Sequence, residues 1–244
     1  MRYPKEHKEQ VRGKLLADSA RHAKQHGFTN SGVDALAASA GLTIGSLYKH
    51  FANKSELFAA LIGTELHRTA ALFAALDPGD EPAVQRALGG YLSMGHVRAA
   101  DQGCALPALA AEVGRADEGV REAFEAGLVE LQGALARLAG SDGDAWVLLA
   151  QSVGAVMLAR AMASEDRQRA LLSAVRQDGA ARLQAALNTS LPGRAPQQRE
   201  HAPFPGRETG IGAGRRLGVG PGAVDGVGHT VAAGRVEHQA DCRP

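Results

Sequence analysis

The chain has 244 residues with a formal net charge of +1, and 45% of its side chains are hydrophobic but only 4% aromatic. This apolar content is ample for a buried core and favours helices, because strands are enriched in aromatic and β-branched residues. No apolar run is long enough for a membrane span, the charged N-terminus lacks the apolar segment of a signal peptide, and two cysteines make no disulfide framework. We therefore expect a helical protein of the cytoplasm that binds no metal ion or cofactor.

The charges are divided unevenly along the chain. Residues 1–55 hold nine Lys and Arg against four acidic side chains, whereas residues 56–188 hold eleven Arg against seventeen acids. A basic segment is typical of proteins that bind a polyanion, and DNA is the commonest one. A chance excess on a solvated surface would give the same count, so charge alone leaves both interpretations open.

The N-terminal segment predicts two helices that each end at a glycine. The first helix is expected over residues 4–26, with Gly27 as its left-handed cap. The second is short and ends at Gly41. Its apolar residues repeat at the i, i+3, i+4 and i+7 positions of one helical face, and they are Val33, Leu36, Ala37 and Ala40.

Two further helices follow directly. Thr43 is expected to cap a third helix that reaches about His50. Asn53, with Glu56 three residues later, predicts a capping box at the start of a longer fourth helix. The turn cluster that begins at Asp77 ends it.

Helical spacing continues to about residue 188, and the last 56 residues differ in kind. Residues 189–244 contain eleven Gly and six of the ten prolines, which predicts disorder. Further helices are expected over 81–99, 105–114, 117–139, 144–163 and 166–188. The predicted fold class is all-α, with a helix-turn-helix domain over 1–55, a helical domain for dimerisation and effector binding over 56–188, and a disordered tail over 189–244.

The second and third helices have the composition of a helix-turn-helix, in which the second helix enters the major groove of DNA. Leu47 and Phe51 lie one turn apart and are expected to face inward. The side chains left to face outward belong to Ile44, Gly45, Ser46, Tyr48 and Lys49.

The sequence around these helices resembles the N-terminal signature of the TetR/AcrR family of transcriptional regulators. The resemblance covers about residues 8–66 and rests on three runs, which are Ala40-Gly41-Leu42-Thr43, Leu47-Tyr48-Lys49-His50-Phe51 and Lys54-Ser55-Glu56-Leu57. The later helices match the family only in number and length.

The resemblance implies a role for each residue of the third helix. Thr43 would cap this helix and touch phosphate, whereas Tyr48 and His50 would reach the DNA backbone or adjacent bases. Lys54 would pair with phosphate at the start of the fourth helix. The residues placed to read base edges are Ile44, Gly45, Ser46 and Lys49.

Each of these residues also has a purely structural interpretation. Tyr48 could be an amphipathic core tyrosine, His50 a surface or capping histidine, and Lys54 a first-turn lysine, although a helix N-terminus disfavours cations. Arg2, Lys5 and Lys8 could form an arm along the phosphates or remain solvated surface.

The resemblance also implies a homodimer on palindromic double-stranded operator DNA, formed through residues 144–188, and release by an unknown small-molecule effector. The dimer contacts are expected to come from Val147, Leu148, Val153, Met157 and Leu158 with Leu171, Leu172, Val175, Leu183 and Leu187. These side chains could instead close the core of the monomer.

An effector pocket is expected among the middle helices. The residues of suitable character are Phe73, Tyr91, Met94, His96, Cys104, Phe124 and Trp146, although core packing explains each of them as well. Cys104 could be a reactive thiol, if the start of a helix depresses its pKa, or simple buried packing.

The sequence therefore predicts a DNA-binding regulator, most simply a repressor, and not an enzyme. It contains no nucleophile elbow, phosphate-binding Walker loop or zinc-binding His-Glu-x-x-His motif. Two alternatives stay open, namely an activator or architectural DNA binder without an effector, and a helical enzyme that binds a small molecule and carries an incidental basic head.

Overall fold

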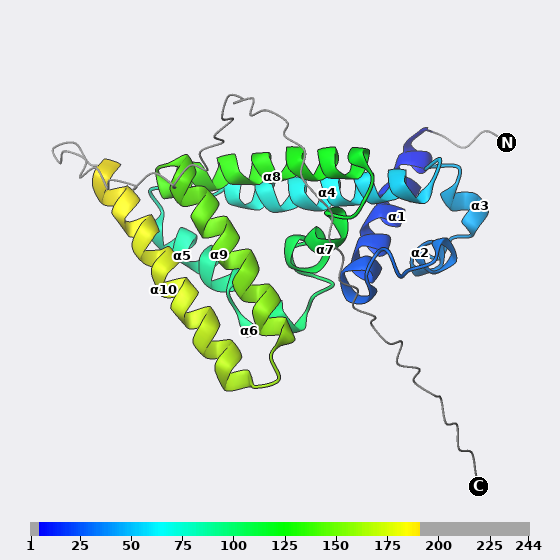
Figure 1. Cartoon of the computed structure of the whole chain (residues 1–244). Coiled ribbons are helices and arrows are strands. Elements are labelled where there is room, and N and C mark those ends of the chain that lie inside the picture. Colours follow the sequence, from blue (N-terminus) through cyan, green and yellow to red (C-terminus); the bar gives the residue numbers. More distant parts are fainter. Residues whose placement is uncertain (1–4, 191–244) are drawn as a thin grey trace, which may run out of the picture. The chain divides into compact units, whose positions relative to one another are not determined.

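The computed structural model describes residues 5–190, and this part of the chain consists of helices without any strand. The predicted all-helical fold is confirmed. The helices shown in Figure 1 are α1 (Lys5–His26), α2 (Val33–Ser39), α3 (Ile44–Leu47), α4 (Lys54–Ala74), α5 (Glu81–Tyr91), α6 (Met94–Arg98), α7 (Leu106–Val113), α8 (Glu118–Ala139), α9 (Asp142–Ala161) and α10 (Glu165–Ser190). The predicted tail, 189–244, lies outside the described residues except for its first two, which belong to α10.

Helices α1, α2 and α3, with the first turns of α4, pack around a small apolar core. Gly27 and Gly41 have the positive φ angles of +81° and +70° that the sequence predicts for them. These two turns reverse the chain tightly enough for Leu36, Leu47 and Phe51 to become fully buried. The expected inward face of the helix-turn-helix is thus confirmed.

Helix α3 is shorter than the sequence predicts. It ends at Leu47 instead of continuing to His50, and the following residues form turns. The Lys49 and His50 amides donate to carbonyls three residues back, whereas the Phe51 amide donates to the Leu47 carbonyl four residues back. The last turn is therefore tightened in the manner common at helix ends.

The predicted helix over 81–99 is also wrong in its length, because it divides into α5 and α6. The Ser93 hydroxyl accepts a hydrogen bond of 3.1 Å from the His96 amide and so caps a new helix. Gly89 and Gly90 precede this point, and their low helix propensity favours a break here. The break turns Tyr91 and His96 toward each other.

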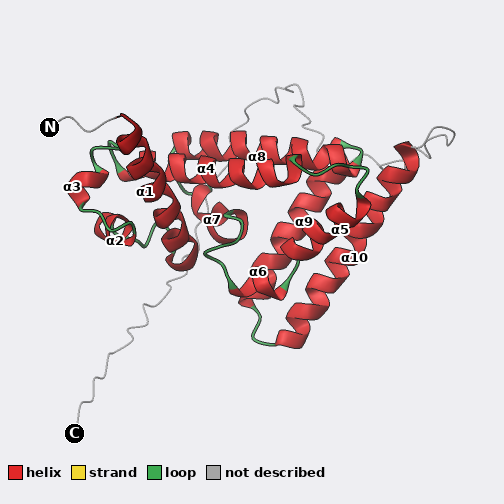
Figure 2. Cartoon of the chain, turned by 180° about the vertical axis from the view of Figure 1, so that it is seen from behind, coloured by secondary structure: helices red, strands yellow, loops and turns green. Residues whose placement is uncertain are grey.

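Helices α4 and α8 lie side by side along most of their length, as both views show (Figures 1 and 2). Gly127 of α8 allows this close approach, because a Cβ atom there would stand 2.7 Å from the Cβ of Leu66 in α4. Helices α9 and α10 pack against each other and against the far part of α8. None of the described helices has both the length and the apolar character needed to cross a membrane.

Candidate functional site: a helix-turn-helix face and a cleft behind it

Helix α3 presents its polar and small residues away from the core. The Thr43 hydroxyl accepts a hydrogen bond of 3.2 Å from the Ser46 amide, so Thr43 is the cap that the sequence predicts. Ile44 is 44% exposed and Tyr48 is 48% exposed, although both are large and apolar in part. Gly45 and Lys49 are exposed as well, and Ser46 is half-buried. A face of this kind is free to meet another molecule.

His50 lies half-buried beside this face, among cations. Burial lowers the pKa of His50, and the neighbouring charges of Lys8, Arg12 and Lys49 lower it further. Its Nδ1 atom is buried and has no hydrogen-bond partner. Because these three cations share one neighbourhood, the edge of α3 carries a local positive potential of the kind that attracts phosphate.

Arg12 is a residue that the sequence analysis missed. Its guanidinium lies 4.9 Å from the centre of the Phe51 ring, which places a helix α1 cation next to α3. The signal was present, since Lys8 and Arg12 are four residues apart on one helical face. Of the proposed N-terminal arm, Arg2 and the side chain of Lys5 lie outside the described residues.

Lys54 has a structural role that the sequence did not predict. Its Nζ atom donates a hydrogen bond of 3.0 Å to the Thr29 carbonyl and lies 5.0 Å from the centre of the Phe28 ring. These contacts explain a cation at the first turn of α4. The Glu56 carboxylate accepts a hydrogen bond of 2.6 Å from the Ala52 amide at the same helix start. A phosphate contact by Lys54 stays a prediction.

A cleft of about 770 Å³ lies beyond the helix-turn-helix domain, between α4, α5, α6 and the segment before α7. Four of the seven residues predicted for the effector pocket line it, namely Phe73, Tyr91, His96 and Cys104. The volume falls within the range of about 300–1,000 Å³ that is usual for small-molecule pockets. Whether these residues bind a ligand stays a prediction.

The other three predicted pocket residues do not line this cleft. Met94 lines a separate depression with Leu172 and Arg176, Phe124 packs against the core, and Trp146 is exposed on α9. All three have helical spacing typical of apolar faces, and the sequence alone gives no means of telling these faces apart.

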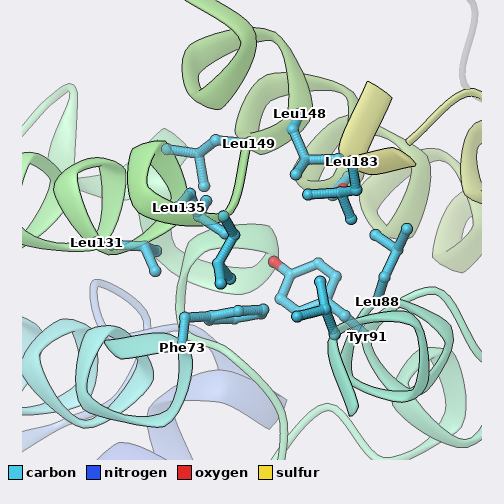
Figure 3. Close-up of a pocket in the computed structure, with 11 residues that line it drawn as sticks. Phe73, Leu88, Tyr91, Leu131, Leu135, Leu148, Leu149 and Leu183 are labelled. Carbon is cyan, nitrogen blue, oxygen red and sulfur yellow. The ribbon is translucent and has the colours of Figure 1, made fainter. Parts of the chain in front are cut away.

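The cleft is separated from a much smaller apolar space by the rings of Phe73 and Tyr91, which line both. This inner space holds only about 30 Å³ and is surrounded mainly by leucines. Figure 3 shows the Tyr91 oxygen pointing into it, on the side of Leu135 and above Phe73. The Tyr91 hydroxyl is buried there without a hydrogen-bond partner.

His96 has a fixed protonation state in the cleft wall. Its Nδ1 atom lies 2.7 Å from the Tyr91 carbonyl, to which it must donate, and its Nε2 atom accepts from the Cys104 amide at 3.1 Å. One ring nitrogen therefore carries the proton and the other does not. Burial lowers the pKa of His96, so the ring is neutral at pH 7.

Cys104 does not have the acidic thiol that a helix start could produce. Its side chain is 6% exposed, and burial raises the pKa of the thiol despite hydrogen bonds that act in the opposite direction. The depressed pKa considered from the sequence is therefore wrong, and the thiol is protonated at pH 7.

A buried lysine of α1 forms hydrogen bonds that connect the cleft wall to the helix-turn-helix domain. Lys24 of α1 donates to the Glu65 carboxylate of α4 at 2.7 Å and to the Gly103 carbonyl at 2.9 Å, and the Lys24 side chain is 1% exposed. Gly103 lines the cleft and precedes Cys104. A displacement of this wall therefore acts directly on α1.

A second connection joins α7 to the turn between α1 and α2. The Glu112 carboxylate accepts hydrogen bonds from the Phe28 amide at 3.1 Å and the Thr29 amide at 2.6 Å. Thr29 is also the residue that binds Lys54, so α1, α4 and α7 meet at this turn.

Helix α9 exposes unusually many large apolar side chains. Three of the seven large apolar side chains that are exposed in the described part of the chain lie on this helix, namely Trp146, Met157 and Leu158. By contrast, Leu148, Leu172 and Leu183, which were expected at a dimer contact, are buried within the subunit itself. These three close the core of the monomer.

These features define a class, that of helical proteins with an N-terminal helix-turn-helix for DNA. Residues 15–61 match the family described as bacterial regulatory proteins, tetR family. This domain is therefore similar to the N-terminal domain of the TetR family of transcriptional regulators. No curated protein sequence matches the chain.

Solved structures of TetR-family regulators share the fold. The reduced form of NemR from Escherichia coli is 21% identical, with a TM-score of 0.58 over 70% of this chain and 95% of that one. A TetR-family regulator from Agrobacterium tumefaciens is 19% identical, with a TM-score of 0.58 over 72% and 98% of the two chains. A regulator from a Rhodococcus species is 22% identical, with a TM-score of 0.55 over 72% and 96%.

Proposed function

We propose that the protein is a cytoplasmic transcriptional repressor, which binds a palindromic operator as a homodimer and releases it when a small molecule enters the cleft. The observation that carries the DNA-binding part is the outer face of α3. Ile44, Tyr48 and Lys49 stand exposed over the buried Leu47 and Phe51. Helix α3 is thus anchored to the core on one side and exposed on the other, as a helix that enters the major groove must be.

Readout by this face rests on few polar groups. Ser46 and Lys49 can exchange hydrogen bonds with base edges, whereas Ile44 can only pack on a thymine methyl group. We expect Tyr48 and the cations around His50 to contact phosphate, which fixes register without reading sequence. The protein is expected to recognise a few positions in each half-site strongly and to tolerate variation elsewhere.

The experiment selects duplexes from a random pool with the full chain and measures affinity for the selected DNA by fluorescence anisotropy. The logarithm of affinity should fall linearly with the logarithm of salt concentration, because phosphate binding releases counterions. Lys49→Ala should relax preference at particular base pairs by about 1–3 kcal/mol, whereas Tyr48→Ala should weaken all sequences alike. Arg167→Ala, an exposed change on α10, is the control.

Release by a ligand is supported by the connections between the cleft and the head. Helix α4 leaves the helix-turn-helix and also lines the cleft with Thr69 and Phe73. Lys24 joins α1 to the cleft wall at Gly103. A ligand that binds one arrangement of these walls more tightly than another would shift the equilibrium between the positions of the helix-turn-helix domain. The size of this shift is set by the difference between the two affinities.

A second candidate function is a helical enzyme that binds a small molecule in the same cleft. The half-buried, neutral His96 and the protonated Cys104 thiol give this function little support, because neither is poised as an acid, base or nucleophile. Such an enzyme would show no affinity for duplex DNA at low ionic strength, and that result would reject the repressor.

A further inference from the structure

The side of the cleft formed by α5, α6 and the segment before α7 is built largely from small residues. Glycine and alanine line it at five positions, which are Ala87, Gly90, Gly95, Ala99 and Gly103. A Cβ atom added at Gly90 would meet nothing within 4 Å, so this position opens onto free space. Because glycine and alanine project little, a flat molecule can lie close to the backbone here.

The side of the cleft formed by α4 and the residues after it supplies apolar surface. Leu72 is 68% exposed, the largest exposed fraction of any large apolar side chain in the described residues. Phe73 and Leu76 line the cleft together with Leu72, and the Tyr91 ring borders it as well. Covering Leu72 would remove apolar surface from water, and the two rings can pack against an aromatic group.

Most polar groups in the cleft wall are already paired within the protein. The two ring nitrogens of His96 are bonded to backbone groups at 2.7 and 3.1 Å, and the Thr69 hydroxyl donates to a carbonyl of its own helix at 3.0 Å. The Gly103 carbonyl accepts from Lys24 at 2.9 Å. Gln102 also lines the cleft, but it is exposed to water. An ionic group that entered the cleft would therefore lose hydration without gaining buried hydrogen bonds in return.

The cleft wall also offers no buried charge among the described residues. His96 and Cys104 are uncharged at pH 7, because burial lowers the pKa of the first and raises the pKa of the second. The charged residue that lines the cleft is Arg68, whose side chain is 54% exposed and donates to the Glu65 carboxylate at 3.0 Å. Since water and Glu65 both screen this guanidinium, it adds little affinity for an anion.

We propose that the cleft binds an uncharged, flat aromatic molecule, which lies along the small residues of α5 and α6 and covers Leu72, Phe73 and Leu76. Affinity for such a molecule comes from apolar and ring contacts, which this wall supplies. An ion with the same rings would bind less tightly, because it loses its hydration on entry. This inference rests on the proposed function, since it names the chemical class of the effector.

The test titrates the full chain, without DNA, by isothermal calorimetry at pH 7. The probes share one ring system and are 2-naphthol, which is uncharged, 2-naphthoate, which is an anion, and 2-naphthylmethylammonium, which is a cation. We expect 2-naphthol to bind about tenfold more tightly than either ion, because it brings no charge into the apolar cleft. If either ion binds as tightly as 2-naphthol, or if 2-naphthol does not bind, the inference is wrong.

The saturated alcohol decahydro-2-naphthol tests the shape of the ligand. It has the same carbon skeleton as 2-naphthol, but its rings are thicker and have no π-system. It should bind several-fold more weakly, because it cannot lie flat along the small residues or form ring contacts with Phe73 and Tyr91. Equal affinity for the two alcohols would overturn the assignment of a flat aromatic ligand.

Gly90→Leu locates the site. Because Gly90 lies within α5 and has no positive φ, a leucine fits the helical backbone there, and its side chain would extend into open space at the cleft. The variant should lose most of its affinity for 2-naphthol without a lower thermal midpoint. Gly133→Leu, at an exposed and equally open glycine of α8 outside the cleft, should bind 2-naphthol as the parent does. Unchanged affinity in Gly90→Leu would overturn the proposal.

Leu72→Ala keeps the test decisive if Gly90→Leu does not fold. It removes exposed apolar surface that the ligand would cover, so 2-naphthol should bind several-fold more weakly while the thermal midpoint stays the same. Val129→Ala, which shortens a 52% exposed side chain of α8, is the control. A merely structural role for Leu72 would lower the midpoint and leave the affinity unchanged. Since no DNA is present, failure here leaves the repressor proposal standing, and failure to bind DNA leaves the cleft site standing.

Discussion

Lys24 shows how one side chain can join two parts of the molecule. Its ammonium group is almost fully buried and binds Glu65 and the Gly103 carbonyl at the same time. From the sequence it is one of several lysines on α1, and its i−4 and i+4 neighbours give no hint of a partner 41 residues away. The contact is produced by packing and could not be predicted from local spacing.

We expect Lys24→Met to destabilise the protein by about 3 kcal/mol, because it leaves a buried carboxylate with Arg68 as its remaining cation. Urea unfolding measures the change. The double variant Lys24→Met with Glu65→Leu should recover most of the loss, since both charges are then gone. A single variant as stable as the parent would show that the pair contributes nothing. Arg169→Met, which breaks an exposed pair with Glu165, is the control and should have no measurable effect.

At the scale of elements, the turn between α2 and α3 was predicted well because its signals are local. Gly41 takes the left-handed conformation, and Thr43 caps α3, as residue type and spacing indicated. The division of 81–99 and the early end of α3 were missed. Both depend on local hydrogen bonds, namely the Ser93 cap and the tightened last turn of α3, and the spacing of apolar residues does not reveal these bonds.

Gly41 and Gly45 make a matched pair for testing whether backbone conformation fixes the turn between α2 and α3. A Cβ atom at either position would meet nothing within 4 Å, so only backbone conformation separates them. Gly41→Ala should destabilise the protein by about 1–2 kcal/mol, because its φ of +70° suits glycine alone. Gly45→Ala should stabilise it by about 0.5–1 kcal/mol, since alanine is the better helix former.

The same pair separates stability from DNA binding. Gly45→Ala adds a methyl group to the exposed side of α3, and it should weaken affinity for selected DNA despite its greater stability. Thermal unfolding and anisotropy on the same samples give both quantities. Equal destabilisation by the two alanines would show that the Gly41 turn is not under the constraint described.

At the scale of the whole molecule, the cleft shows the limit of sequence reasoning. Phe73, Tyr91, His96 and Cys104 were predicted for a pocket and do line one. Arg160, whose Nη2 atom donates to the His96 carbonyl at 2.9 Å, was not considered. Arg160 follows an apolar run on α9 and resembles a terminal arginine that points to water. Only the packing of α9 behind α6 turns it inward.

The exposed apolar face of α9 belongs to the same scale, and we expect it to form the contact between two subunits. Leu158 is 57% exposed, with Met157 beside it, and burying such a face between two copies would be favourable. Leu158→Glu should give a folded monomer with weak DNA binding, as judged by sedimentation velocity and anisotropy. Val129→Glu alters an equally exposed apolar side chain on α8 and should remain dimeric. A dimeric Leu158→Glu protein would place the contact elsewhere.

The close approach at Gly127 restricts how α4 and α8 can move relative to each other. With backbone and Leu66 in contact at this point, α4 has no room to slide or roll over α8 without a clash. Under the proposed release by a ligand, we therefore expect α4 and α8 to move together, so that a displacement at the cleft reaches the helix-turn-helix through both. Replacing Gly127 by a larger residue would force the two helices apart and, under the same proposal, should uncouple ligand binding from DNA release, although Gly127 does not line the cleft.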